Sequence, residues 1–175
     1  NINIGAWDVS RVTNFNEMFK DAVTFDQDIS NWDMSNAQQL VSMFEGALSF
    51  DRDISGWTTT SLKLLTKTFK NAKKFTFSLD GWDVSKVTDM TSLFEGAELF
   101  NGIITNWVTS SVTSMSRMFF DAKKFNRNLN AVGSKWNTAS VSNMKEMFKS
   151  ALEFNGEVEN WNTRAVTTME SMFEN

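Results

Sequence analysis

The carboxylates in this sequence that could do chemistry form two aspartate pairs. Asp26 and Asp28 lie two residues apart, and Asp51 and Asp53 repeat this arrangement farther along the chain. If these segments stack, the four carboxylates come close together. They could then bind Ca²⁺, which prefers oxygen ligands, or supply the acid and the base of a glycoside hydrolase. We favour a third interpretation, in which they are turn residues that hydrogen-bond the local backbone, and we treat them as weak Ca²⁺ candidates only.

The rest of the composition offers little catalytic material. The chain has no His and no Cys, which excludes Ser-His-Asp and Cys-His triads, thiolate metal sites and disulfides. A net charge of −4 argues against a nucleic-acid partner, which would select a basic surface. No apolar run of about 18 residues is present, so we expect no membrane span. We therefore expect no catalytic residue, no cofactor and no enzymatic activity.

The elements that must position these side chains are copies of one repeat. Seven tryptophans recur at a spacing of about 25 residues, the length typical of a short structural repeat. A phenylalanine follows each tryptophan at the same fixed interval. We expect these rings to form the structural core: Trp7, Trp32, Trp57, Trp82, Trp107, Trp136, Trp161, Phe19, Phe44, Phe69, Phe94, Phe119, Phe148 and Phe173.

Each repeat contains two periodicities. Val12, Phe15, Met18, Phe19 and Ala22 fall on one face of a helical period, which predicts a short helix of about three turns. The stretch before each tryptophan has wider apolar spacing and usually an Asn or Gly, which predicts an extended segment with a short strand and a corner.

Stacked units would join their apolar stripes into one core. The expected fold class is an α/β solenoid, a leucine-rich-repeat-like curved array of seven units of about 25 residues, each a short strand or extended segment plus a short helix. Curvature is expected because strands pack about 4.8 Å apart and helices about 8–10 Å apart.

The expected domain organisation is a single repeat domain over residues 1–175. Four extra residues precede Trp136, around positions 130–133, and we expect them to form a loop that is either neutral or part of a functional face. Both ends cut through a unit, so we expect a piece of a longer array or subunits that continue end to end.

Lysines recur on the predicted helical side. Lys73 and Lys74 are matched by Lys123 and Lys124 two repeats later, with Glu98 between them. Such a group could attract an anionic polymer, for example an acidic polysaccharide. We favour a solvated face on which acids and bases mix.

The repeat resembles a known family. The residues that carry the likeness are Trp7-Asp8-Val9-Ser10, Met18-Phe19, Asp83-Val84-Ser85 and Val87-Thr88-Asp89-Met90. They are similar to the short surface-protein repeat found in mycoplasma lipoproteins and lactobacillus surface proteins, which is related to BspA-like leucine-rich repeats. The resemblance implies a leucine-rich-repeat-like array at the cell surface, with adhesive roles for some BspA-like members.

The expected function is a non-catalytic repeat module for adhesion or protein–protein interaction, located at the cell surface or outside the cell. Its partner would be a protein or a glycan. One alternative is a structural subunit of a filament or surface layer that assembles end to end. A weaker alternative is a polysaccharide-binding or carbohydrate-active module that uses the four aspartates.

Overall fold

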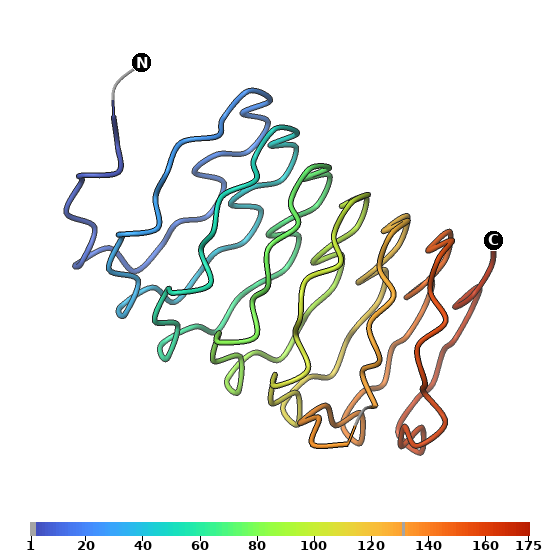
Figure 1. Ribbon diagram of the computed structural model, residues 1–175. Helices are drawn as coiled ribbons and strands as arrows, with labels where there is room; N and C mark the ends of the chain where they lie inside the picture. The colour runs from blue at the N-terminus through green and yellow to red at the C-terminus, as the bar shows by residue number, and fades with distance from the viewer. Residues whose placement is uncertain (1–2, 131) are drawn as a thin grey trace.

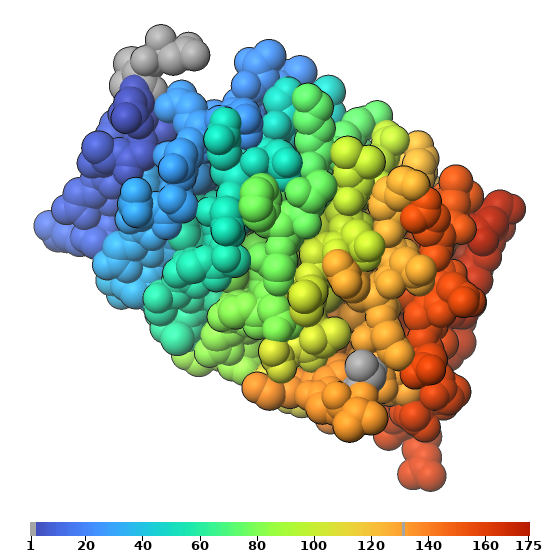
Figure 2. Space-filling view, in the orientation of Figure 1, coloured from blue at the N-terminus to red at the C-terminus, as the bar shows by residue number. Residues whose placement is uncertain are grey.

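The computed structural model describes residues 3–130 and 132–175. Each repeat forms one coil of the chain, and the coils lie side by side from the N-terminus to the C-terminus (Figure 1). In the space-filling view the coils appear as adjacent bands of colour in contact with one another (Figure 2).

The regular elements expected in each repeat are absent. The described residues contain no helix and no named strand, only isolated parallel bridges between successive coils: Asn14–Gln39, Gln39–Leu64, Asp89–Ser114, Ser114–Asn143 and Asn143–Thr168. The prediction of an α/β, leucine-rich-repeat-like solenoid of helix-plus-strand units is therefore wrong. The argument for curvature fails with it, because no helical layer is present in the described part of the chain to fan out against a strand layer.

Two left-handed residues in each coil explain why no helix forms. The residues ten positions after each tryptophan, and fourteen positions after the first six tryptophans, have φ between 52° and 72°, outside the α-helical region. They are Glu17, Ser42, Lys67, Ser92, Arg117, Glu146 and Ser171 at the first position, and Asp21, Gly46, Asn71, Gly96, Asp121 and Ser150 at the second. Consecutive tight turns thus produce the three-residue apolar spacing that resembles a helical face.

The backbone amides of these turns alternate between two kinds of partner. Met18 N donates to Phe15 O at 3.2 Å within the turn, whereas Phe19 N donates to Met43 O of the next coil at 2.9 Å. The same alternation recurs in the following coils. Each coil therefore satisfies half of these amides locally and half on its neighbour, and buried amides need such partners.

Stacked rings fill the interior. The phenylalanines twelve residues after each tryptophan form a ladder with centroid separations of 5.4–5.7 Å. A second phenylalanine ladder runs from Phe25 to Phe154 with separations of 5.8–6.0 Å. The two ladders also stack on each other within a coil, as in Phe94 and Phe100 at 3.9 Å. Offset and parallel ring contacts of this kind add to the burial of apolar area.

The expected core residues differ in how far they are buried. Trp32, Trp57, Trp82 and Trp107 are buried, as are the phenylalanines of the first ladder from Phe19 to Phe148. Trp136 and Trp161 are half-buried. Trp7 and Phe173, on the two end coils, are 50% and 52% exposed.

Five of the indoles also make a polar link to the preceding coil. The Nε1 of Trp57 donates to the carbonyl of Ile29 at 3.1 Å, and the Nε1 of Trp82 to the carbonyl of Ile54 at 3.1 Å. Trp32, Trp107 and Trp136 repeat the bond with Ile4, Leu79 and Ile104. A buried tryptophan needs a partner for its N–H, and in these five residues that partner is a carbonyl of the coil before.

The second left-handed position alternates Asx and glycine over its first four members, for a steric reason. A Cβ on Gly96 would collide with Oδ1 of Asn71 in the preceding coil, and a Cβ on Gly46 would collide in the same way with Asp21. Glycine is thus favoured at these two positions both by its φ and by the side chain stacked on it.

We predict that Gly96→Ala lowers the free energy of unfolding by about 1–2 kcal/mol, because alanine is strained at φ +68° and meets Asn71. Gly56→Ala is the matched control, since its φ is not in the left-handed region and no atom lies within 4 Å of the added Cβ. Urea unfolding of both variants measures the difference. Equal effects of the two substitutions would contradict this account of the turn.

Candidate functional site

The first aspartate of each predicted pair links successive coils. Oδ1 of Asp26 accepts the backbone N–H of Asp51 at 3.1 Å, and Oδ2 pairs with Nη2 of Arg52 at 2.6 Å. Oδ1 of Asp51 in turn accepts the N–H and the hydroxyl of Thr76 at 3.0 and 2.8 Å. Asparagines continue the same row farther along the stack, as where Oδ1 of Asn101 accepts the next coil's amide at 3.1 Å.

The second aspartate of each pair closes a local turn. Oδ1 of Asp28 accepts the N–H of Ser30, and Oδ1 of Asp53 accepts the N–H of Ser55, both at 3.0 Å. These serine bonds, from hydroxyl and backbone, lower the pKa of Asp28 and of Asp53 below the ordinary value. Backbone donors keep such a carboxylate in its ionised form. It therefore stabilises the turn and is poorly suited to transfer a proton.

The structure places no multidentate metal site on these acids. Within residues 3–130 and 132–175, no group of three or more His, Cys, Asp or Glu side chains is arranged to hold a metal ion. The same described residues include no helix with the length and apolar character needed to cross a membrane.

One edge of the stack carries shallow polar hollows. We call it the Trp-turn edge and define it by the turns before each tryptophan, residues 28–33, 53–58, 78–83, 103–108, 128–130 with 132–137, and 157–162. These turns lie along the lower edge of the view in Figure 1. One hollow of about 490 Å³ is lined by Asp28, Ser30, Asp53 and Ser55 among others. A second, of about 440 Å³, is lined by Asp80, Trp82 and Val108 among others.

The opposite edge carries charges of alternating sign. We call it the charged edge and define it by residues 17–24, 42–49, 67–74, 92–99, 117–124 and 146–153. Thirteen residues after each tryptophan, successive coils present Lys20, Glu45, Lys70, Glu95, Phe120, Lys149 and Glu174. Lys70 and Glu95 form an ion pair at 3.2 Å, and Lys149 and Glu174 form another at 3.1 Å.

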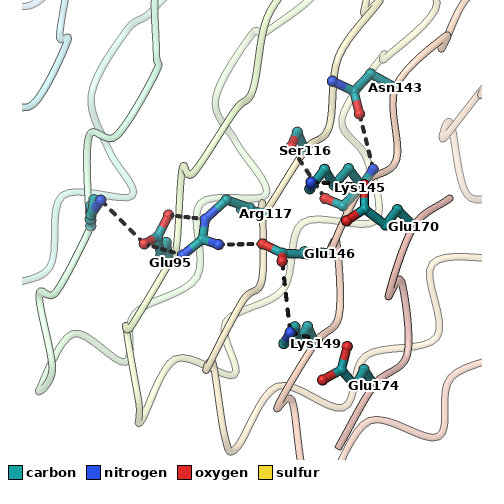
Figure 3. Close-up of polar contacts among 10 residues, drawn as sticks. Glu95, Ser116, Arg117, Asn143, Lys145, Glu146, Lys149, Glu170 and Glu174 are labelled. Carbon is teal, nitrogen blue, oxygen red and sulfur yellow. Dashed lines mark hydrogen bonds and ion pairs between the residues drawn. The ribbon is translucent and has the colours of Figure 1, made fainter. Parts of the chain in front are cut away.

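Arg117 bridges the point where the alternation is interrupted. Phe120 lies at the position where the alternation would place a lysine. The Arg117 guanidinium lies 3.9 Å from the centre of the Phe120 ring, which is a cation–π contact. The guanidinium bonds Glu95 on one side, at 2.9 Å, and Glu146 on the other (Figure 3). Glu146 continues to Lys149 at 3.7 Å. A planar group with five donors suits such a two-sided contact.

A second row on this edge involves the lysines singled out in the sequence. Lys73 and Lys123 both pair with Glu98, at 2.8 and 2.9 Å. Lys124 pairs with Glu153. The charges of Lys73, Lys123 and Lys124, though not that of Lys74, are therefore matched by acids of neighbouring coils. This leaves less unbalanced positive charge for an anionic polymer than the sequence clustering suggested.

Glu95 is the most strongly perturbed acid of the charged edge. Burial raises its pKa, but hydrogen bonds from Arg117, Ser92 and Lys70 outweigh burial and lower the pKa to about 2. Sequence reasoning missed Glu95, Arg117 and Glu146 as a group. The alternation of sign thirteen residues after each tryptophan could have revealed Glu95, but Arg117 and Glu146 lie ten residues after their tryptophans, where the sequence shows no such alternation.

The comparisons with known proteins identify a family but no characterised relative. The family described as "Mycoplasma protein of unknown function, DUF285" matches residues 1–80 and 65–175. No curated protein and no solved structure matches the chain.

We predict that Glu95→Gln lowers the free energy of unfolding at neutral pH by roughly 2 kcal/mol, because it removes a charge-assisted contact from a mostly buried group. A depressed pKa stabilises the fold above the ordinary value of 4.5, and this contribution is lost as the pH falls toward about 2. The wild-type protein should therefore lose more stability than the variant between pH 4.5 and 2.

Urea unfolding of both proteins across this pH range provides the measurement. Parallel pH profiles for the two proteins would show that Glu95 has no depressed pKa and that the ion pairs of the charged edge hold it only weakly.

Proposed function

We propose that this chain, which belongs to the DUF285 family of mycoplasma proteins of unknown function, is a non-catalytic cell-surface repeat module that binds a protein or a glycan. The resemblance of its repeat to those of mycoplasma lipoproteins and BspA-like surface proteins supports a location outside the cell. Kinship with the BspA-like repeats is part of this proposal.

The observation that carries the proposal is the row of hollows on the Trp-turn edge. Hollows of about 490, 440 and 290 Å³ lie on turns of the same kind in different coils. Their linings are rich in Asp, Asn, Ser and Thr, whose side chains can hydrogen-bond a peptide or a sugar. A repeat array presents such positions in a line, which suits an extended partner that contacts several coils at once.

The alternative of a carbohydrate-active enzyme is less well supported. A glycosidase needs one carboxylic acid with a raised pKa to protonate the leaving group. Asp28 and Asp53 instead have lowered pKa values, and Asp26 and Asp51 hold the amides of the following coil.

The other alternative is a structural subunit that assembles end to end. In the tight turns the amides of each coil donate to the carbonyls of the coil that follows, and an end-to-end assembly would use bonds of the same kind between subunits. Light scattering against protein concentration separates the alternatives, because an assembling subunit gains mass and a monomeric binding module does not.

We predict that Ser30→Arg combined with Val108→Arg weakens partner binding by at least roughly tenfold, because two arginines fill two hollows and a lost contact of about 1.4 kcal/mol is tenfold. Leu152→Arg, on the charged edge, is the control, since Leu152 is 64% exposed and lies outside the hollows. Binding is measured on a glycan array and on immobilised extracellular matrix proteins.

Two outcomes would count against the proposed function. One is binding that Leu152→Arg weakens as much as the double variant does. The other is hydrolysis of an arrayed glycan that disappears when Asp26, Asp28, Asp51 and Asp53 are replaced by Asn.

A further inference from the structure

Trp161 is the exception to the indole ladder. Its Nε1 is buried and has no hydrogen-bond partner within residues 3–130 and 132–175. In Trp32, Trp57, Trp82, Trp107 and Trp136 the same atom donates to a carbonyl of the preceding coil. A buried N–H without a partner is rare in native proteins and calls for a specific cause.

The cause is the four-residue insertion. Ile104 lies three residues before Trp107, and its carbonyl accepts Nε1 of Trp136 at 2.7 Å. The corresponding Leu129 lies seven residues before Trp136, and its carbonyl accepts the Ser134 hydroxyl at 2.8 Å. The insertion therefore removes the acceptor that the repeat would otherwise provide for Trp161. Ala131, within the insertion, lies outside the described residues.

The same insertion supplies a second buried donor. Nδ2 of Asn130 is buried and has no partner in the described part of the chain. Asn130 and Trp161 both line one cavity of about 290 Å³, which we call the insertion pocket. Its lining is completed by Ser134, Lys135, Trp136, Asn137, Thr138, Asn160 and Asn162.

Amide side chains line much of the insertion pocket, and two of them have their oxygens already engaged. Oδ1 of Asn137 accepts the N–H of Ala139 at 2.9 Å, and Oδ1 of Asn162 accepts the N–H of Arg164 at 3.1 Å. The oxygens of these amides are therefore engaged, and their nitrogens are the groups left for a ligand. No Asp or Glu lines the pocket among the described residues, unlike the hollows beside Asp28 and Asp80.

Lys135 adds a positive charge to this set of donors. Its backbone N–H bonds Thr105 of the preceding coil at 3.0 Å. Its ammonium group forms no ion pair with any described residue, unlike those of Lys73, Lys123, Lys124 and Lys149 on the charged edge. An ionised carboxylate has two oxygens that only accept hydrogen bonds, so it complements two N–H donors and a nearby cation.

We propose that the insertion pocket binds a carboxylate, held by Nε1 of Trp161 and Nδ2 of Asn130 and attracted by Lys135. The carboxylate belongs to an acidic sugar or to a peptide. Lys135 also lines the neighbouring hollow beside Asp80, but the two residues that carry the buried donors line the insertion pocket alone. This proposal rests on the proposed function, because the insertion pocket is one of the hollows of the Trp-turn edge.

Two-dimensional ¹H–¹⁵N NMR tests the proposal, because the indole N–H groups give signals apart from the backbone amides. The probes are glucuronate for the acidic sugar, N-acetylaspartate for the peptide carboxylate, and glucose as the neutral control. We expect the Trp161 signal to move downfield with glucuronate or N-acetylaspartate and the Trp57 signal to stay in place. The compound that binds more tightly shows whether the carboxylate ligand belongs to an acidic sugar or to a peptide.

Four variants make the test specific. Lys135→Gln and Trp161→Phe should each weaken binding by roughly tenfold, the effect of losing one hydrogen bond to a charged group. Trp57→Phe removes the same N–H from a regular coil and should leave the affinity unchanged. Deletion of residues 130–133 restores the regular repeat spacing and should abolish binding, because Leu129 can then accept from Trp161.

The proposal is overturned if neither carboxylate moves the Trp161 signal, or if glucose moves it equally. It is also overturned if the deletion variant binds as tightly as the wild-type protein. A crystal structure in which ordered water alone joins the two donors, in the presence of saturating glucuronate and N-acetylaspartate, would likewise contradict it.

Discussion

The hydrogen bond from a backbone amide of one coil to a carbonyl of the next is the constraint on which the rest of this structure depends. Because alternate amides are satisfied laterally, for example Phe69 N on Leu93 O at 2.9 Å, the turns between them need no helix. The left-handed residues that close these turns cost about 1–2 kcal/mol each, so the lateral bonds and the stacked phenylalanines must offset that strain. Each coil is consequently stable only beside its neighbours, as expected of a repeat protein.

The same lateral relation determines what the surface side chains do. A carboxylate such as Asp26 stacks on the backbone of the next coil and accepts its amide, so it contributes to register. On the charged edge, opposite signs in adjacent coils reinforce the same register, and Arg117 restores the contact where Phe120 interrupts it. Positions that break the lateral pattern are therefore the informative ones, and the insertion before Trp136 is the clearest of them.

The sequence predicted the repeat and its phase, because the aromatic residues that stack in successive coils recur at a constant spacing along the chain. It also indicated that Asp28 and Asp53 hydrogen-bond the local backbone of a turn, whereas Asp26 and Asp51 bond the following coil instead. It misled on the helix, because an apolar spacing of three or four, as in Phe15, Met18 and Ala22, arises in a helix and also in successive tight turns. The left-handed φ of the intervening residues decides between the two, and non-glycine residues carry little sequence signal for that conformation. The unpaired indole of Trp161 depends on one displaced carbonyl, which spacing alone does not reveal.

Scalar coupling across hydrogen bonds tests the central claim most directly. In a long-range ¹⁵N–¹³C correlation experiment, the amide nitrogen of Phe69 should couple to the carbonyl carbon of Leu93 in the next coil. A helical repeat would instead couple Phe69 to Leu65, four residues earlier in the chain. Observation of the Leu65 coupling, with none to Leu93, would contradict the laterally bonded coil and every assignment built on it.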